Sequence, residues 1–165
     1  MVLTLPDGAD GRRTMSTQLV EQAITLLQLT PSWLEILLDE PRLAEAIELG
    51  RIVCGAEPLS RDLQRRVADR IPVELFNHYG PTEAAVDVTA YRCDPDDTAS
   101  FASIGRPIDG VRATLADDRL QLVAPGQVGE ILAGGRGVAR GYEGQPRLTA
   151  ERFRPDPEAG QRPSP

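Results

Sequence analysis

The segment from Asn77 to Glu83 reads Asn-His-Tyr-Gly-Pro-Thr-Glu and carries side chains well suited to binding a nucleotide. The ring of Tyr79 is a flat platform on which a purine can stack. The Thr82 hydroxyl can donate to a phosphate oxygen, and the Glu83 carboxylate can bind Mg²⁺ that is shared with phosphates. Gly80 lets the backbone approach a ligand closely. These residue types predict a nucleotide site, although a strand that ends in a glycine-proline turn explains them equally well.

The glycines between residues 134 and 141 could also be interpreted as a phosphate-binding loop. Such loops end in a lysine that reaches the phosphates. The sequence contains no lysine, because all 18 of its basic residues are arginine. We therefore interpret these glycines as tight turns between strands, and any ammonium group that the chemistry needs must come from another polypeptide segment.

The composition of the whole chain argues against nucleic acid and membranes as binding partners. The chain has 165 residues and a net charge of −7, which predicts no affinity for nucleic acid or for an anionic membrane. No apolar run is long enough to span a membrane, and the first ten residues do not resemble a signal peptide. Cys54 and Cys93 form no metal-binding pattern, so we predict a cytoplasmic location with reduced thiols.

The elements that must position the nucleotide segment alternate between strands and helices. Apolar runs of strand length cover residues 2–5, 24–29, 52–54 and 73–79, and helices are predicted near 16–23 and over 41–50. Thr30 and Ser60 are predicted N-caps of two further helices, the first of which has Pro31 at its first position. The pattern predicts an α/β fold with a mostly parallel sheet, in which ligands bind at the carboxyl ends of the strands.

The second half of the chain shows a different pattern. Apolar runs at 111–115, 120–123 and 128–132 are separated by turn residues, which predicts a small antiparallel lobe or partial barrel. A short helix is predicted over 146–153, and the proline-rich tail is predicted to be disordered. The expected domains are an α/β part over 1–92, a connecting loop over 93–104, a β-rich lobe over 105–154 and a tail over 155–165.

Several segments together resemble the amino-acid adenylation domains of nonribosomal peptide synthetases, within the AMP-binding superfamily. Residues 77–83 resemble the fifth core motif of that family, and residues 129–142 with 147–153 resemble the sixth and its flank. Residues 29–32, 53–60 and 104–108 are also typical of the family. The resemblance runs from about residue 2 to residue 157 and identifies the chain as an internal fragment of such a domain.

The resemblance implies an ATP-dependent ligase that converts an amino acid into an acyl-adenylate and transfers it to a phosphopantetheine thiol on a carrier domain. Tyr79 would then stack on adenine and Asn77 would hold its amino edge, with His78 and Gly80 in the same cofactor loop. Thr82 would contact the α-phosphate, and Glu83 would bind Mg²⁺. Thr82 and Glu83 are thus the candidate catalytic residues.

The family's amino-acid pocket corresponds here to six positions, of which three are polar, and this predicts a polar amino acid as substrate. The alternative interpretation is that His78 and Asp87 have only structural roles and that Cys54 is a small buried residue. The six positions are Gln28, Ile52, Cys54, His78, Val86 and Asp87.

Three parts of the family's machinery do not occur in this sequence: the lysine-bearing phosphate loop, the ribose-binding aspartate and the small lobe with the catalytic lysine. We therefore expect the chain to be inactive by itself and hypothesise a truncated reading frame. The alternatives are a split subunit that works with other synthetase fragments, a non-catalytic nucleotide-binding or interaction module, and a fragment of an acyl-CoA or aryl-acid ligase.

Overall fold

The computed structural model describes residues 8–155, and its account of side chains begins at Met15. The predicted strand over 2–5 and the tail beyond residue 155 lie outside the described residues. The chain forms two compact units, the first made of residues up to Tyr79 with Thr89–Arg106, and the second of Gly80–Val88 with residues from Pro107 onward. Residues 80–88 group with the second unit, whereas the sequence analysis places them in the α/β part over 1–92. Backbone bonds within the second unit explain this, since Ile108 donates to Val88 and Ala139 donates to Glu83.

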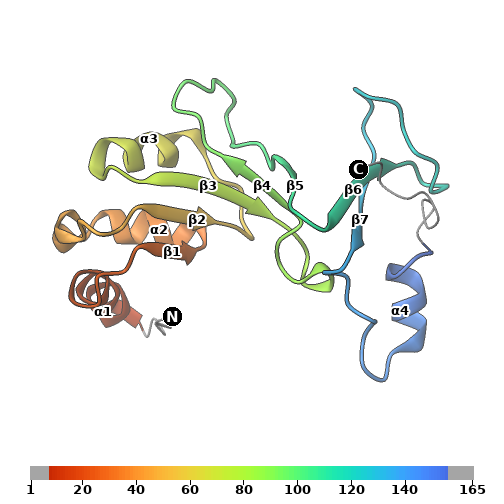
Figure 1. Cartoon of the computed structure of the whole chain (residues 1–165), viewed down its shortest axis with the longest axis horizontal. Coiled ribbons are helices and arrows are strands. Elements are labelled where there is room, and N and C mark those ends of the chain that lie inside the picture. The colour runs from red at the N-terminus through yellow and green to blue at the C-terminus, as the bar shows by residue number, and fades with distance from the viewer. Residues whose placement is uncertain (1–7, 156–165) are drawn as a thin grey trace. The chain divides into compact units, whose positions relative to one another are not determined.

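The first unit contains a five-stranded sheet in the order β1-β2-β3-β4-β5 (Figure 1). The first three strands are parallel, and β4 runs antiparallel to β3. The prediction of a mostly parallel sheet flanked by helices is confirmed, whereas the sequence had not indicated β4 or β5. The strands are β1 (Leu26–Leu29), β2 (Arg51–Cys54), β3 (Glu74–Tyr79), β4 (Thr89–Arg92) and β5 (Arg106–Pro107).

Three α-helices, α1 (Gly8–Glu21), α2 (Pro31–Leu38) and α3 (Arg61–Arg70), belong to this unit. Both predicted N-caps are confirmed. The Thr30 hydroxyl accepts from the backbone N–H of Trp33 at 3.4 Å, and the Ser60 hydroxyl accepts from that of Leu63 at 3.2 Å. Each bond satisfies a donor that the first helical turn leaves unpaired.

The helix predicted over 41–50 is wrong in length, because only the 3₁₀-helix η1 (Pro41–Glu45) forms there. The backbone N–H groups of Gly50 and Arg51 both donate to the carbonyl of Thr25. The chain must therefore already be extended at residue 50 to enter the sheet beside β1, which leaves no room for a longer helix.

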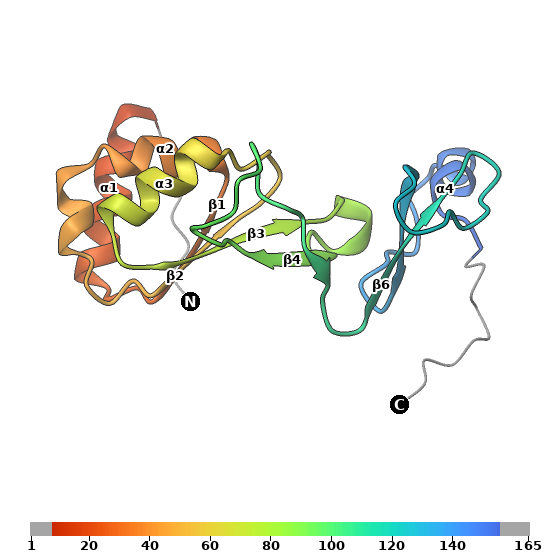
Figure 2. The ribbon, with the colours of Figure 1, turned by 90° about the horizontal axis from the view of Figure 1, so that it is seen from above.

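The helices cover one face of the sheet, and Figure 2 shows α2 and α3 on the same side of β2 and β3. Alternate strand residues point to this face and join the apolar side chains of the helices in one core. Its most deeply buried members, each at most 2% exposed, are Leu34, Leu37, Leu43, Ile52, Cys54, Leu59 and Val67. This core fixes which side chains at the strand ends face the helices.

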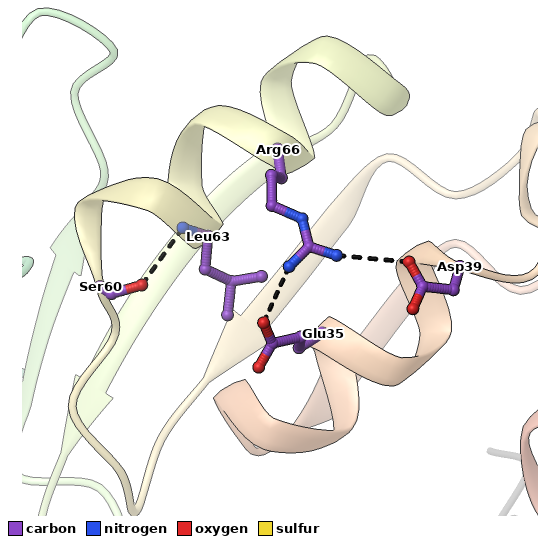
Figure 3. A network of polar contacts seen from close by, with 5 residues as sticks. All are labelled: Glu35, Asp39, Ser60, Leu63 and Arg66. Carbon is purple, nitrogen blue, oxygen red and sulfur yellow. Dashed lines mark hydrogen bonds and ion pairs between the residues drawn. The ribbon is translucent and has the colours of Figure 1, made fainter.

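Arg66 links α3 to α2 at the surface (Figure 3). Its guanidinium lies 2.8 Å from a carboxylate oxygen of Glu35 and 3.3 Å from one of Asp39. All three side chains are more than a third exposed, so this network contributes little to stability.

The second unit is built on a two-stranded antiparallel sheet of β6 (Val111–Ala116) and β7 (Glu130–Gly135). It also contains the 3₁₀-helix η2 (Thr82–Ala84) and α4 (Pro146–Arg152), which confirms the helix predicted at 146–153. The strand predicted over 120–123 is wrong, since Leu122 makes only an isolated bridge to Ala116. The cause is local: the Asp117 carboxylate accepts from the backbone N–H groups of Arg119 and Gln121, which holds the chain in a tight turn.

No helix in the part of the chain that the structure describes has both the length and the apolar character needed to cross a membrane.

Candidate functional site

The carboxyl ends of three parallel strands meet at one edge of the first unit's sheet. Leu29 of β1 pairs with Cys54 of β2, and Cys54 pairs with Asn77 of β3. The next two residues of β3 are His78 and Tyr79, so the nucleotide segment begins where such sheets bind ligands.

Asn77 presents a buried polar atom that nothing in the described chain satisfies. Its side chain is 5% exposed, and its Nδ2 donates to the carbonyl of Ser103 at 2.9 Å. Its Oδ1 is buried and has no hydrogen-bond partner among the described residues. Because an unpaired buried acceptor is costly, this position favours a ligand that donates a hydrogen bond.

Tyr79 ends β3 with its side chain 38% exposed. The ring is therefore accessible for stacking, as the sequence-based interpretation requires. The backbone of this residue remains tied into the sheet, where Tyr79 pairs with Thr89 of β4.

The predicted pocket residues of the first unit do not share one face of the sheet. Ile52 and Cys54 are both 0% exposed and lie in the core on the helix-covered face. Gln28 and His78 occupy the opposite parity in their strands, so they lie on the other face. The structure thus brings Gln28 and His78 to the same face and separates them from Ile52 and Cys54.

The environment of Cys54 agrees with its interpretation as a small buried residue. Burial, with smaller contributions from the nearby Cys93 and Glu57, raises the pKa of its thiol to about 12. The thiol is therefore protonated at neutral pH and is a poor nucleophile.

In the second unit, residues 80–88 form a tight loop around η2. The backbone N–H groups of Ala84 and Val86 both donate to the carbonyl of Pro81. Ala85 and Val86 have φ values of 56° and 74°, which is strained for residues with a Cβ. A Cβ at Gly80 would lie 2.3 Å from the carbonyl oxygen of Val86, so the loop itself requires glycine there.

Glu83 is held at both its backbone and its side chain. Its carbonyl accepts from the N–H of Ala139 at 2.7 Å, and its Oε1 accepts from the hydroxyl of Tyr142. The Tyr142 hydrogen bond is the main cause that lowers the pKa of Glu83, and Glu83 in turn raises the pKa of Tyr142. The carboxylate is therefore ionised at neutral pH, as a metal ligand must be.

Tyr142 is the functional candidate that residue-by-residue reasoning missed. The signal was present in the Arg140-Gly141-Tyr142 part of the sixth core motif, but nothing local connects that segment to Glu83. The two residues lie 59 positions apart.

The remaining predicted residues of the second unit lie around the same loop. Thr82 and Val86 are exposed, the latter at 57%, while Asp87 is half-buried. Within the described residues, no three His, Cys, Asp or Glu side chains gather into a ready metal site. A single carboxylate such as Glu83 still suits Mg²⁺, which takes most of its other ligands from water and substrate phosphates.

A family model described as AMP-binding enzyme matches residues 1–143. The chain belongs to this family. It is 46% identical over 158 residues to phosphinothricin tripeptide synthetase PhsB of Streptomyces viridochromogenes, which covers 95% of this chain and 13% of that protein. It is 42% identical over 143 residues to indigoidine synthase of Dickeya dadantii, covering 84% of the chain and 10% of that protein.

Solved structures extend the relationship to the fold. The N-terminal subdomain of NpsA from Klebsiella oxytoca, in complex with 3-hydroxybenzoyl-AMSN, matches with a TM-score of 0.77 at 25% identity. That match covers 93% of this chain and 38% of the solved one. PA1221, a nonribosomal peptide synthetase protein that contains adenylation and PCP domains, matches with a TM-score of 0.73 at 30% identity over 87% of this chain and 28% of its own.

These matches confirm the resemblance to adenylation domains of nonribosomal peptide synthetases. The sequence corresponds to a segment of such a domain, and it spans 13% and 10% of the two synthetase relatives named above.

Proposed function

We propose that this segment supplies the adenine, α-phosphate and magnesium contacts of an enzyme that adenylates an amino acid with ATP for nonribosomal peptide synthesis. The observation that carries the proposal is the buried, unpaired Oδ1 of Asn77 at the carboxyl end of β3. Membership of the AMP-binding family supports it independently.

In the first unit, Asn77 accepts a hydrogen bond from the exocyclic amino group of adenine through Oδ1. Its Nδ2 stays on the Ser103 carbonyl, which fixes the direction of the amide. Tyr79 offers its accessible ring to the purine face, and His78 precedes it in the cofactor loop; Gly80, the loop's next residue, belongs to the second unit. An amide locked in this orientation favours adenine over a base that carries a carbonyl at the same place.

In the second unit, the Thr82 hydroxyl donates to the α-phosphate and the ionised Glu83 carboxylate binds magnesium. When bound, Mg²⁺ offsets the negative charge that builds on the phosphates during the reaction. The hydrogen bond from Tyr142 and the backbone bond from Ala139 keep Glu83 fixed beside Thr82.

We assign the amino-acid pocket first to Gln28 and His78, which share the sheet face that the helices leave uncovered. Their polarity favours a polar amino acid. Ile52 and Cys54 shape the pocket from within the core. Val86 and Asp87, the other two candidate pocket residues, belong to the second unit.

The acyl group then passes to a phosphopantetheine thiol on a carrier domain, the kind of partner that accompanies adenylation in PA1221. Because the sequence has no lysine, any ammonium group that stabilises the reacting carboxylate and phosphates must come from elsewhere in the domain. We propose that the chain alone does not complete the reaction.

A second candidate substrate class is an aryl acid, favoured by the likeness to NpsA, which was solved with a hydroxybenzoyl ligand. The two classes separate in an assay of acid-dependent ATP–pyrophosphate exchange with a panel of amino acids and hydroxybenzoates. The assay uses a PhsB chimera, in which this chain replaces the 158 residues of PhsB that align with it.

The same chimera tests the adenine contact. Asn77→Ala removes the acceptor, so the preference for ATP over inosine triphosphate should fall by about tenfold or more. Gln64→Ala, which also removes a buried amide with an unpaired oxygen but lies in α3, serves as the matched control. An unchanged preference in Asn77→Ala would contradict the proposed contact.

A further inference from the structure

Tyr142 directs its hydroxyl at the carboxylate of Glu83 and is hydrogen-bonded to Oε1. We infer that Tyr142 is a positioning residue, which orients the Glu83 carboxylate for the magnesium ion of the adenylation reaction. The inference rests on the proposed function, because it takes Glu83 as the metal ligand, and it adds a residue that acts only through Glu83.

The phenol of Tyr142 is itself held in place by the neighbourhood of α4. The backbone N–H of Tyr142 donates to the hydroxyl of Thr149 at 2.9 Å. The ring meets that of Phe153 edge-to-face, with centroids 5.5 Å apart and planes at 77°. A Cβ at Gly141 would lie 2.4 Å from the Thr149 methyl carbon, so glycine allows this close approach. The hydroxyl therefore reaches Glu83 from a fixed direction.

The short segment 139–142 forms hydrogen bonds with Glu83 at two points. Ala139 binds its carbonyl and Tyr142 binds its carboxylate, so residues 139–142 fix both the backbone and the side-chain rotamer. With Oε1 held by Tyr142, we take Oε2 as the carboxylate oxygen that binds the metal ion. A freely rotating carboxylate loses rotamer entropy when it binds a metal ion. Because Tyr142 already holds one oxygen of Glu83, this cost of binding is smaller.

A purely structural role would be the alternative: Tyr142 could merely fasten η2 to the α4 end of the unit. That role predicts a loss of stability when the hydroxyl is removed, but no loss of metal affinity in the folded protein. A positioning role predicts a loss of metal affinity, which for residues that orient metal ligands is about 10- to 100-fold.

The test compares Tyr142→Phe with Tyr91→Phe. Tyr91 is the matched control because its hydroxyl also binds a carboxylate, that of Asp97 at 3.3 Å, but in the first unit. The dissociation constant of Mn²⁺, a paramagnetic substitute for Mg²⁺, is measured in the PhsB chimera with ATP by electron paramagnetic resonance. Melting curves fix a temperature at which every variant is folded, and Thr149→Val gives a second, milder displacement of the phenol.

We expect Tyr142→Phe to weaken Mn²⁺ binding about 10- to 100-fold, Thr149→Val to weaken it less, and Tyr91→Phe to leave it unchanged. In a Glu83→Gln background, Tyr142→Phe should have no further effect, because it acts through Glu83. If Glu83→Gln weakens the metal and Tyr142→Phe does not, the inference is overturned and the proposed function stands. If Glu83→Gln leaves Mn²⁺ affinity unchanged, the metal assignment in the proposed function falls first.

Discussion

Replacing Gly80 with alanine should distort the loop that carries Thr82 and Glu83. The added Cβ would lie 2.3 Å from the carbonyl oxygen of Val86 and 2.7 Å from the backbone nitrogen of Val88. Both are backbone atoms, so no side chain can rotate away, and the shorter contact lies more than 1 Å below an ordinary contact distance. Relief therefore requires the chain to move at Val86, a residue that is already strained at a φ of 74°.

The expected cost is about 1–3 kcal/mol of unfolding free energy, the usual penalty for overpacking a tight site. Gly50→Ala is the control, since its new Cβ would meet nothing closer than the Thr25 carbonyl oxygen at 3.9 Å and its φ is ordinary. The two variants of the full chain are compared by urea denaturation, which gives the difference in unfolding free energy directly.

Hydrogen exchange locates the effect. The N–H groups of Ala84 and Val86 donate to the Pro81 carbonyl and close the loop, so both should exchange faster in Gly80→Ala and remain unchanged in Gly50→Ala. Equal urea midpoints for the two variants, together with unchanged exchange at Ala84 and Val86, would refute the steric reasoning.

Two further predictions concern the first unit. Arg66→Gln should lower stability by less than about 1 kcal/mol, and added salt should erase the difference, because the ion pairs to Glu35 and Asp39 are exposed; a larger or salt-independent loss in urea melts would contradict this. The pKa of Cys54 is raised to about 12 and that of Cys93 to about 11, chiefly by burial. Their contribution to stability is therefore fully present below the unfolded thiol pKa of about 8.5 and is lost as pH rises above it. Cys54→Ala should flatten the fall in urea midpoint between neutral and alkaline pH, and a profile as steep as that of the unsubstituted chain would argue against it.

Local signals in the sequence were sufficient for much of the first unit. A threonine before a proline and a serine before an amphipathic stretch predicted the starts of α2 and α3, because an N-cap is decided by residues within one turn. The apolar runs gave the three parallel strands for a similar reason. The same reasoning was wrong at 41–50 and at 120–123, where backbone hydrogen bonds donated to the Thr25 carbonyl and to the Asp117 carboxylate overrode the helical and strand patterns.

The side of the sheet on which a residue lies was decided by tertiary packing. Alternation alone says that Cys54 and Val53 point to opposite faces, but only the packing of the helices determines which face is covered. The predicted pocket residues were therefore divided between the core and the uncovered face. Sequence could identify Gln28 and His78 as polar, but their common face follows from the register of β1, β2 and β3.

The sequence alone was enough to recognise the motif from Asn77 to Glu83, since its residue types and order identify the family without any coordinates. What only the tertiary structure decided is the state of its key groups: the unpaired oxygen of Asn77 and the carboxylate of Glu83 held by Tyr142. Burial and hydrogen bonding depend on neighbours that are distant in sequence, 26 residues away for Ser103 and 59 for Tyr142, and folding alone brings them together.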